Sequence, residues 1–411
     1  MKKTNQKFIY GLIFLSVISI FLTSCGHKKT LRTVDQIQLF TLNYGNYEDE
    51  LRLEGNGQFS PINSRIVMKD GFFYVTDDYA KKIMQFTSYG DLTSIIYRQD
   101  TNPEPSFIHK IGKGEINENG IKSATQSAQT YDFNAIQDVT VDSHKNIFVV
   151  DQISSERQEI DTEENILLRE IVLNFSRDGV FKGYYGQEGL GGTPFPTITN
   201  IFITNNDELV VVCIPRKENF IVYWFNQNGS LKWKIPVKNS FLPQSETENS
   251  FVSIEKIIPD YSSPILYIKA DYYKVSIDEE LNVQSGIDYQ LSLMHQFNIE
   301  KSDFEQPFEI PPYEDVITDR FSKLIYKIPY NFLGVNASGN FFFLMPDETG
   351  LVIQIMMSNG QRAIKRHIKY DTISSVHTDF SVSQEGIISG LIAGVESSQI
   401  VWWRTDSLVD R

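Results

Sequence analysis

The side chains able to bind metals or transfer protons are spread thinly along this chain. None of its histidines shows the His-x-His, His-x₃-His or HExxH spacing that brings two ligands to one metal; they are His27, His109, His144, His295, His367 and His377. The acid pair Asp77-Asp78 lies at the end of an apolar run, where carboxylates usually cap turns. A metal site assembled from distant segments stays open, because sequence spacing would not reveal it.

Motifs for nucleophilic catalysis or phosphate binding are also missing from the sequence. We find no Gly-x-Ser-x-Gly. The stretch GYYGQEGLGG, residues 183–192, is rich in glycine, but it lacks the Gly-Lys-Ser/Thr ending and no helix is predicted after it. We therefore expect a flexible link there. The sequence predicts no enzyme and no cofactor, and it assigns no catalytic, cofactor-binding or metal-binding residue.

The two cysteines lie in different settings. Cys213 belongs to ELVVVCIPR, an apolar strand-like run in which a thiol behaves as a small hydrophobic side chain. Cys25 follows Lys2, Lys3 and Lys7, an apolar run of about fifteen residues, and the small residues of Thr23-Ser24. That order is typical of a secretory signal peptide, and the run is shorter than the roughly twenty residues that span a bilayer. We predict a signal peptide at residues 1–24.

The residues around the predicted cut resemble a known signal. Leu22-Thr23-Ser24-Cys25 resembles the lipobox of bacterial lipoproteins, an aliphatic residue and two small residues before cysteine. In that family the cysteine receives a diacylglycerol and becomes the first residue after cleavage. The resemblance implies that Cys25 is a lipid attachment site and that residues 25–34 form a lipidated tether. Acyl chains contribute about 0.8 kcal/mol per buried methylene, so two or more hold a protein firmly at a membrane. An ordinary secretory signal followed by a stray cysteine is the alternative.

Charge and composition restrict the partners. The formal net charge is −14, and loss of the three lysines in the signal peptide lowers it to −17. An acidic body does not bind nucleic acid through phosphate contacts, and anionic lipid headgroups repel it. We therefore expect no nucleic-acid partner and membrane attachment through lipid alone. A hydrophobic content of 41% is ample for a folded core.

A strand–turn–strand pattern recurs along the rest of the chain. An alternating run, a turn and a second run rich in Val, Ile, Phe and Tyr form each copy. A third and often a fourth strand follow, across turns such as Arg177-Asp178-Gly179 and Gln227-Asn228-Gly229. Six copies begin at Arg65, Asp138, Asn200, Ser253, Gly334 and Asp379. Each copy is a four-stranded meander that must stack on its neighbours to bury both faces.

These units predict an all-β fold, a β-propeller of six blades, within a domain at residues 35–411. Each unit has roughly 60 residues, more than the 40–45 of a compact blade, so seven or eight blades stay open. The final unit contains at most three strands, whereas residues 34–45 alternate before the first unit. We predict that this N-terminal strand completes the last blade and closes the ring, which removes both free edges.

The repeats also resemble a known family. Residues 173–212, LNFSRDGVFKGYYGQEGLGGTPFPTITNIFITNNDELVVV, are similar to the NHL repeat, and TVDSHKNIFVVDQ at 140–152 is similar to its strand pair. The resemblance implies an NHL-like propeller. That family includes binding modules and a few enzymes, so it informs fold more than function.

The functional hypothesis is a lipid-anchored scaffold that binds other envelope proteins. The plan resembles the propeller lipoprotein of the outer-membrane β-barrel assembly machinery, without its eight blades or its tryptophan-centred repeat, and the composition resembles spirochaete lipoproteins. We expect the protein to lie in the bacterial cell envelope, at the outer membrane and facing the periplasm. The lipid on Cys25 would bind it to the membrane, and its partner would be an outer-membrane barrel complex. A glycan-binding or glycan-processing propeller enzyme and a surface-displayed adhesin are the alternatives.

Overall fold

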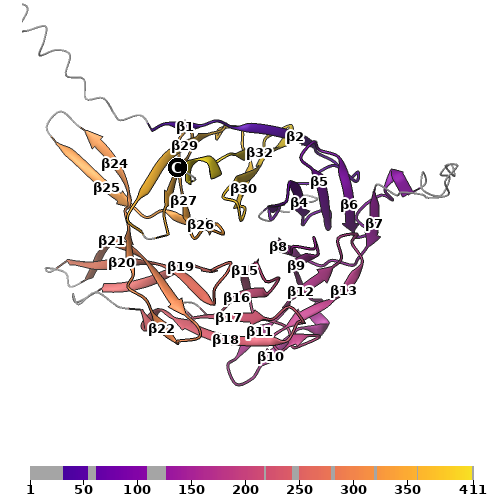
Figure 1. The fold of residues 1–411 in the computed structure, drawn as a ribbon, viewed down its shortest axis with the longest axis horizontal. Helices are drawn as coiled ribbons and strands as arrows, with labels where there is room; N and C mark the ends of the chain where they lie inside the picture. The colour runs from indigo at the N-terminus through magenta and orange to yellow at the C-terminus, as the bar shows by residue number, and fades with distance from the viewer. Residues whose placement is uncertain are drawn as a thin grey trace, which may run out of the picture.

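The computed structural model describes residues 31–53, 62–108, 126–216, 219–242, 250–278, 283–318, 322–358 and 360–409. They form a ring of six radial β-sheets, as predicted, so the fold is an all-β propeller of six blades (Figure 1). The signal peptide, Cys25, His27 and the start of the tether fall outside the described residues, as does His109. Those assignments stay predictions.

The first three blades follow the predicted copies in order. Blade 1 contains β3 (Ile66–Lys69), β4 (Phe72–Asp77), β5 (Lys82–Thr87), β6 (Leu92–Tyr97) and β7 (Ser127–Thr130). Blade 2 contains β8 (Ile136–Val141), β9 (Ile147–Gln152), β12 (Glu170–Phe175), β13 (Phe181–Gly186) and β14 (Gly189–Leu190). Blade 3 contains β15 (Ile198–Ile203), β16 (Leu209–Arg216), β17 (Asn219–Phe225) and β18 (Leu231–Lys238).

The other three blades complete the ring. Blade 4 contains β19 (Ser250–Pro259), β20 (Ile265–Asp278), β21 (Val283–Asn298), β22 (Asp303–Phe304) and β23 (Phe308–Ile310). Blade 5 contains β26 (Asn331–Val335), β27 (Phe341–Asp347), β28 (Gly350–Met356), β29 (Ala363–Lys369) and β1 (Thr33–Val34). Blade 6 contains β30 (His377–Val382), β31 (Ile388–Ala393), β32 (Ser397–Trp403) and β2 (Ile37–Asn43).

The N-terminal strand closes the ring, which confirms the prediction. Strand β2 pairs antiparallel with β32, from Ile37 opposite Trp402 to Asn43 opposite Ser397. Phe40 of β2 also lies against Phe73 of blade 1, with ring centroids 6.1 Å apart. Just before β2, the two residues of β1 pair in parallel with β29 of blade 5. The start of the described chain therefore joins blades 5 and 6 and packs on blade 1.

Hydrophobic clusters lie between neighbouring blades rather than within one sheet. Tyr74 and Ile96 of blade 1, for example, pack with Val139 and Val149 of blade 2 in one fully buried cluster. Comparable clusters join each following pair of blades around the ring. The predicted hairpin turns have the backbone that glycine allows, with φ of +87° at Gly90 and +85° at Gly229.

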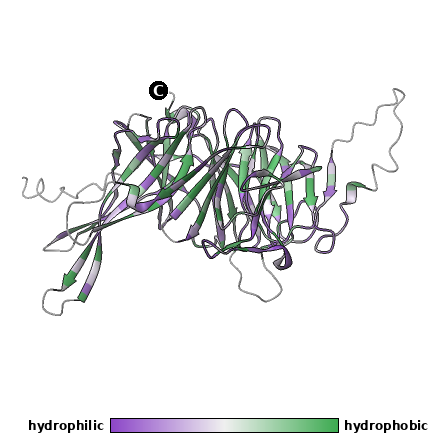
Figure 2. Cartoon of the chain, turned by 90° about the horizontal axis from the view of Figure 1, so that it is seen from below, coloured by the Kyte–Doolittle hydropathy of each residue, from purple (hydrophilic) through white to green (hydrophobic). Residues whose placement is uncertain are grey.

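Among the described residues, three insertions leave the ring. Strands β10 (Glu159–Asp161) and β11 (Ile166–Leu168) form a small exposed hairpin, and β24 (Tyr313–Thr318) with β25 (Lys323–Ile328) forms another, between blades 4 and 5. The third is the outer half of β20–β21, whose 14 and 16 residues exceed the lengths of all other described strands. Both β24–β25 and β20–β21 project from the same side of the ring (Figures 1 and 2).

Helical structure is sparse. Single turns occur at η1 (Ser155–Arg157), η2 (Asn239–Phe241) and α3 (Asp406–Val409). Within the described residues, no helix has the length and apolar character needed to cross a bilayer. The glycine-rich stretch at 183–192 is more ordered than the flexible link that we predicted, because β14 pairs with β13 and Leu190 N–H donates to Gly229 O of blade 3 at 3.3 Å.

Candidate functional site

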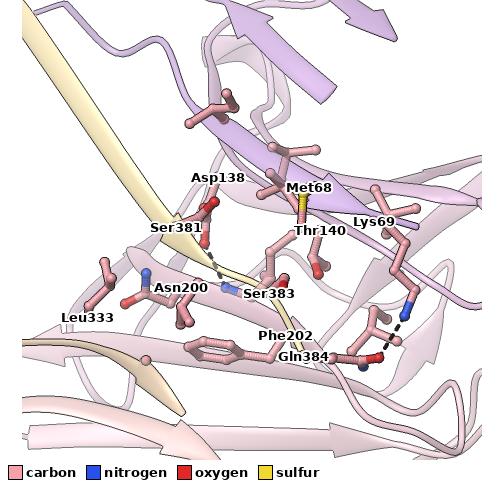
Figure 3. A pocket seen from close by; sticks show the side chains of 18 of the residues that line it. Met68, Lys69, Asp138, Thr140, Asn200, Phe202, Leu333, Ser381, Ser383 and Gln384 are labelled. Carbon is pink, nitrogen blue, oxygen red and sulfur yellow. Dashed lines mark hydrogen bonds between the residues drawn. The ribbon is translucent and has the colours of Figure 1, made fainter. Parts of the chain in front are cut away.

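The first strand of every blade lines a central cavity of about 180 Å³ (Figure 3). One position per blade forms a ring of six residues within it: Arg65, Asp138, Asn200, Lys256, Leu333 and Asp379. Four of these strands have a register irregularity beside the ring position, for example between Ile254 and Lys256. Such irregularities re-aim side chains. The sequence repeat thus places two basic and two acidic groups in one narrow channel.

Carboxylates of this inner layer bind the backbone of the next blade. Asp379 Oδ2 accepts from Ile66 N at 2.8 Å, and its Oδ1 lies 3.0 Å from Arg65 Nη1. Asp138 Oδ2 accepts from Ile201 N at 2.9 Å. Blades 6 and 1, and blades 2 and 3, are therefore joined by the same device.

In blade 4 the carboxylate that binds the backbone of the next blade belongs to Glu255, one position before the ring residue Lys256. Glu255 Oε2 accepts from Phe332 N of blade 5 at 3.2 Å, and Lys256 Nζ donates to Leu333 O at 3.1 Å. Contacts of this kind stabilise the ring because the backbone N–H and C=O groups that they satisfy lie at the inner end of each sheet.

The electrostatics of the ring are balanced. Burial acts to lower the pKa of Arg65, but the charges of Asp379 and Asp138 outweigh it and raise that pKa. Burial raises the pKa of Asp138 despite the nearby Arg65. Burial likewise lowers the pKa of Lys256, against the attraction of Glu255 and Asp138. Chemically, the ring pairs opposite charges across blade boundaries and holds the sheets in place.

A second polar cluster is buried within blade 4. Lys269 Nζ lies 2.8 Å from Asp271 Oδ2 and 3.8 Å from Glu255 Oε2. On the same sheet, Tyr272 Oη lies 3.0 Å from His295 Nε2, and burial lowers the pKa of His295 to about 4. The sequence analysis missed this cluster, because its members are scattered among apolar residues on long strands.

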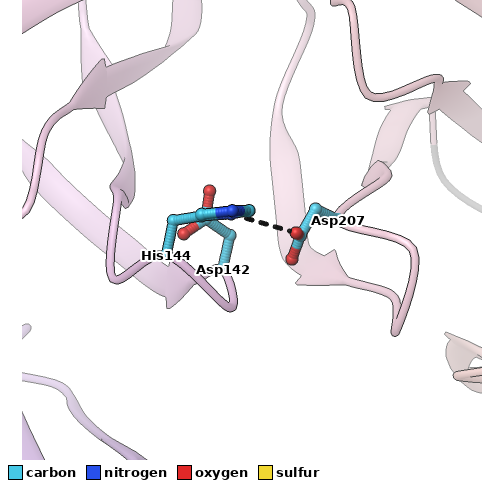
Figure 4. Close-up of side chains that lie close together, drawn as sticks. All are labelled: Asp142, His144 and Asp207. Carbon is cyan, nitrogen blue, oxygen red and sulfur yellow. Dashed lines mark ion pairs between the residues drawn. The ribbon is translucent and has the colours of Figure 1, made fainter.

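One group of His and Asp residues, at the turns of blades 2 and 3, lies close enough to share a metal ion (Figure 4). His144 Nδ1 is 3.2 Å from Asp207 Oδ2, and the His144 side chain is 69% exposed. Ser143 Oγ donates to Asp207 Oδ2 at 2.6 Å, and Asn146 N donates to Asp142 Oδ1 at 2.7 Å. Protein donors thus already bind both carboxylates. The cluster fastens two neighbouring turns.

Other residues singled out from the sequence have structural roles. Asp77 accepts from Ala80 N at 2.8 Å and from Arg52 N at 2.7 Å, so it caps the turn as expected. Cys213 is a buried free cysteine in β16, and burial raises the pKa of its thiol well above the usual value. His367 Nε2 lies 2.8 Å from Asp347 Oδ2, and His377 Nε2 lies 2.9 Å from Ser64 O.

The two projecting hairpins have exposed apolar surface. On β24–β25, one face is formed by Tyr313, Ile317, Leu324, Tyr326 and Ile328 around Asp315, because these residues pair across the strands. Ile317, Leu324 and Tyr326 are 51%, 52% and 50% exposed. These side chains form an exposed apolar surface on a two-stranded hairpin, an element that is only marginally stable by itself in water.

An aromatic ladder lies on the outer half of β20–β21 and the adjoining start of β19. Phe251 stacks on Tyr273 with ring centroids 5.3 Å apart, and Tyr273 meets Tyr289 edge-on at 6.0 Å. Val275 and Ile287 pair next along the same hairpin. Ile287 is 53% exposed. We call this set, Phe251, Tyr273, Val275, Ile287 and Tyr289, the aromatic ladder.

No protein-family model and no curated protein matches the chain. Among solved structures, an ulvan lyase of polysaccharide lyase family PL25 is 9% identical, with a TM-score of 0.42 over 89% of this chain and 95% of the lyase. The Nup133 β-propeller domain of Vanderwaltozyma polyspora is 10% identical, with a TM-score of 0.41 over 91% of this chain and all of that domain. A gluconolactonase from Xanthomonas campestris is 9% identical, with a TM-score of 0.38 over 91% and 96%. The ring of six sheets characterises the chain by its fold, a six-bladed β-propeller.

Proposed function

We propose that this protein is a lipid-anchored scaffold of the bacterial cell envelope, which binds a partner protein through the aromatic ladder on β20–β21. The observation that carries the proposal is the ladder itself. Blade 4 needs strands of only six to eight residues, as in blade 3, yet β20 and β21 continue for about twice that length. Their outer halves contribute little to the ring.

The composition of the ladder suits protein recognition. Tyrosine is favoured at binding hot spots because it combines a large apolar ring with one polar group and loses little conformational entropy. Burial, despite a hydrogen bond with Ser292, raises the pKa of Tyr289 to about 12, so its hydroxyl stays protonated at neutral pH. The partner class that we propose is an outer-membrane barrel complex, which the anchor at Cys25 would bring into reach.

A photo-crosslinking experiment tests the proposal. A photoreactive phenylalanine analogue replaces Ile287 in the full-length protein in its native cells. The same analogue at Val180 is the matched control, because the two side chains are 53% and 52% exposed. We expect one stoichiometric adduct with an envelope protein at position 287 and none at position 180.

Two results would contradict this function. One is the absence of an adduct at position 287 in cells where the chain is acylated and folded. The other is turnover of cell-wall or host glycans by the purified protein, which would favour the enzyme alternative. Protease treatment of intact cells separates the adhesin alternative, since only a surface-displayed body would be digested.

A further inference from the structure

We propose that the β24–β25 hairpin rests its apolar face on the lipid surface to which the chain is tethered. The inference rests on the anchor in the proposed function, and it adds a membrane-contacting element that fixes how the ring is oriented. The lipid bilayer is the occupant that the position, chemistry and length of the hairpin favour.

The base of the hairpin lies close to the point where the chain enters the ring. Lys365 Nζ on β29 donates to Pro312 O, just before β24, at 3.3 Å, and the Lys365 ammonium lies 5.4 Å from the centre of the Tyr330 ring, just after β25. Two residues further along β29, His367 pairs with Thr33 of β1. Strand spacing and rise place the hairpin base within about 15 Å of Thr33.

The tether can extend somewhat further than the hairpin. Seven residues separate Cys25 from Thr33, and the eight residue steps between them span at most about 28 Å when the chain is fully extended. Strand β24 rises about 17 Å over its six residues. Strand β1, where the described chain begins, and the β24–β25 hairpin lie on the same side of the ring (Figure 1). An anchored molecule can therefore bring the outer end of the hairpin to the bilayer.

The side chains suit a shallow contact. The apolar face presents Ile317 and Leu324 near the tip and Tyr326 behind them, an aromatic of the kind found at membrane interfaces. The opposite face has Lys323 and Lys327 beside the 50% exposed Ile325, and long lysine side chains reach toward headgroups. Asp315 sits midway along the apolar face, and the outer strand edges carry backbone polar groups. Both features keep the hairpin out of the hydrocarbon core.

The test measures lipid contact at the hairpin directly. The acylated full-length chain is reconstituted in vesicles of phosphatidylethanolamine and phosphatidylglycerol. An environment-sensitive fluorophore is attached through Leu324→Cys, and Val180→Cys is the matched control. Both native side chains are 52% exposed, and Val180 lies between β12 and β13, on the far side of the ring (Figure 1). Cys213 is buried and does not compete for the label.

A second arm of the experiment tests the hairpin contact independently of the predicted anchor at Cys25. The chain starting at Gly26, with an N-terminal hexahistidine tag, is bound to nickel-chelating lipid in the same vesicles. If the chain purified from its native cells fails to float with vesicles while the second arm shows lipid contact, the anchor at Cys25 is wrong and the hairpin contact stands.

We expect nitroxide-labelled lipid to quench the probe at position 324 by about twofold or more relative to position 180, in every arm where the chain is vesicle-bound. Adding Ile317→Ser and Tyr326→Ser should abolish that difference. Equal quenching of the probe at positions 324 and 180 on vesicle-bound protein would overturn the inference. A change at position 324 that follows protein concentration without lipid would also overturn it, since a second copy of the chain would then cover the face.

Discussion

Asp379 on the first strand of blade 6 accepts a hydrogen bond from the backbone of Ile66 on the first strand of blade 1, at 2.8 Å and across 313 residues of sequence. The same carboxylate pairs with Arg65 at 3.0 Å. One side chain thus joins the last blade to the first at the inner end, while β2 joins them at the outer edge. The two contacts hold the ring closed from both ends of the sheet.

Asp379→Asn tests the inner contact. An amide can still accept from Ile66 N, but it loses the charge that pairs with Arg65, so we expect a loss of about 1–3 kcal/mol in unfolding free energy. Chemical denaturation measures the loss. Asp178→Asn is the control, since Asp178 lies 69% exposed in a hairpin turn and its change should stay within about 0.5 kcal/mol. Equal effects of the two changes would contradict the structural role.

Leu42→Ala tests the outer contact. Leu42 of β2 is 2% exposed and packs in the cluster that joins blades 6 and 1. We expect a loss of about 2–5 kcal/mol, because truncation leaves a cavity in the closing strand. Loss of β2 would also bare the edge of β32, so the variant should self-associate on size-exclusion chromatography. The change Leu190→Ala, at a 57% exposed position, should do neither.

Stability should fall as the pH drops from about 6.5 to about 4 through His295. Burial lowers its folded pKa to about 4, whereas the unfolded value is about 6.5. The unfolded chain therefore binds the proton first, and stability that is present above pH 6.5 is lost toward pH 4, by about 2–3 kcal/mol. His295→Gln retains a polar group beside Tyr272 and removes the titration. Denaturation at several pH values should show a flatter profile for the variant; an unchanged profile would assign the acid sensitivity elsewhere.

Cys213 should be inert in the folded protein. It is fully buried, and burial raises its thiol pKa, so the reactive thiolate is scarce at neutral pH. A maleimide reagent should modify it only after denaturant is added. Fast labelling of the native protein, followed by mass spectrometry of the modified peptide, would show that blade 3 opens locally.

Cys25→Ala tests the predicted anchor. We expect the change to abolish incorporation of labelled palmitate and to release the protein from membranes, because the lipid is the proposed attachment. The β-rich circular dichroism spectrum should not change, since the described ring begins later in the chain. Cys213→Ala is the matched control and should keep the label. Palmitate incorporation into the Cys25→Ala variant would contradict the lipobox assignment.

Features that depend on neighbouring residues could be predicted from the sequence. Alternation and glycine-containing turns such as Asn228-Gly229 define each meander, because side-chain period and turn geometry are local properties. The need to pair the free edge of β32 identified the closing strand near Ile37. The lipobox around Cys25 is also local. Cys25 lies outside the described residues, so its lipid attachment stays a prediction.

Only the tertiary structure decided what distant side chains do together. Asp379 accepts a hydrogen bond from Ile66 N, and Asp207 accepts one from Ser143 N. These contacts form because the ring places first strands and turns of separate blades side by side. The sequence also could not tell the exposed Ile317 and Leu324 from the many buried apolar residues of other strands. Exposure depends on whether another sheet covers a face, and for β24–β25 none of the described blades does, since both strands leave the ring.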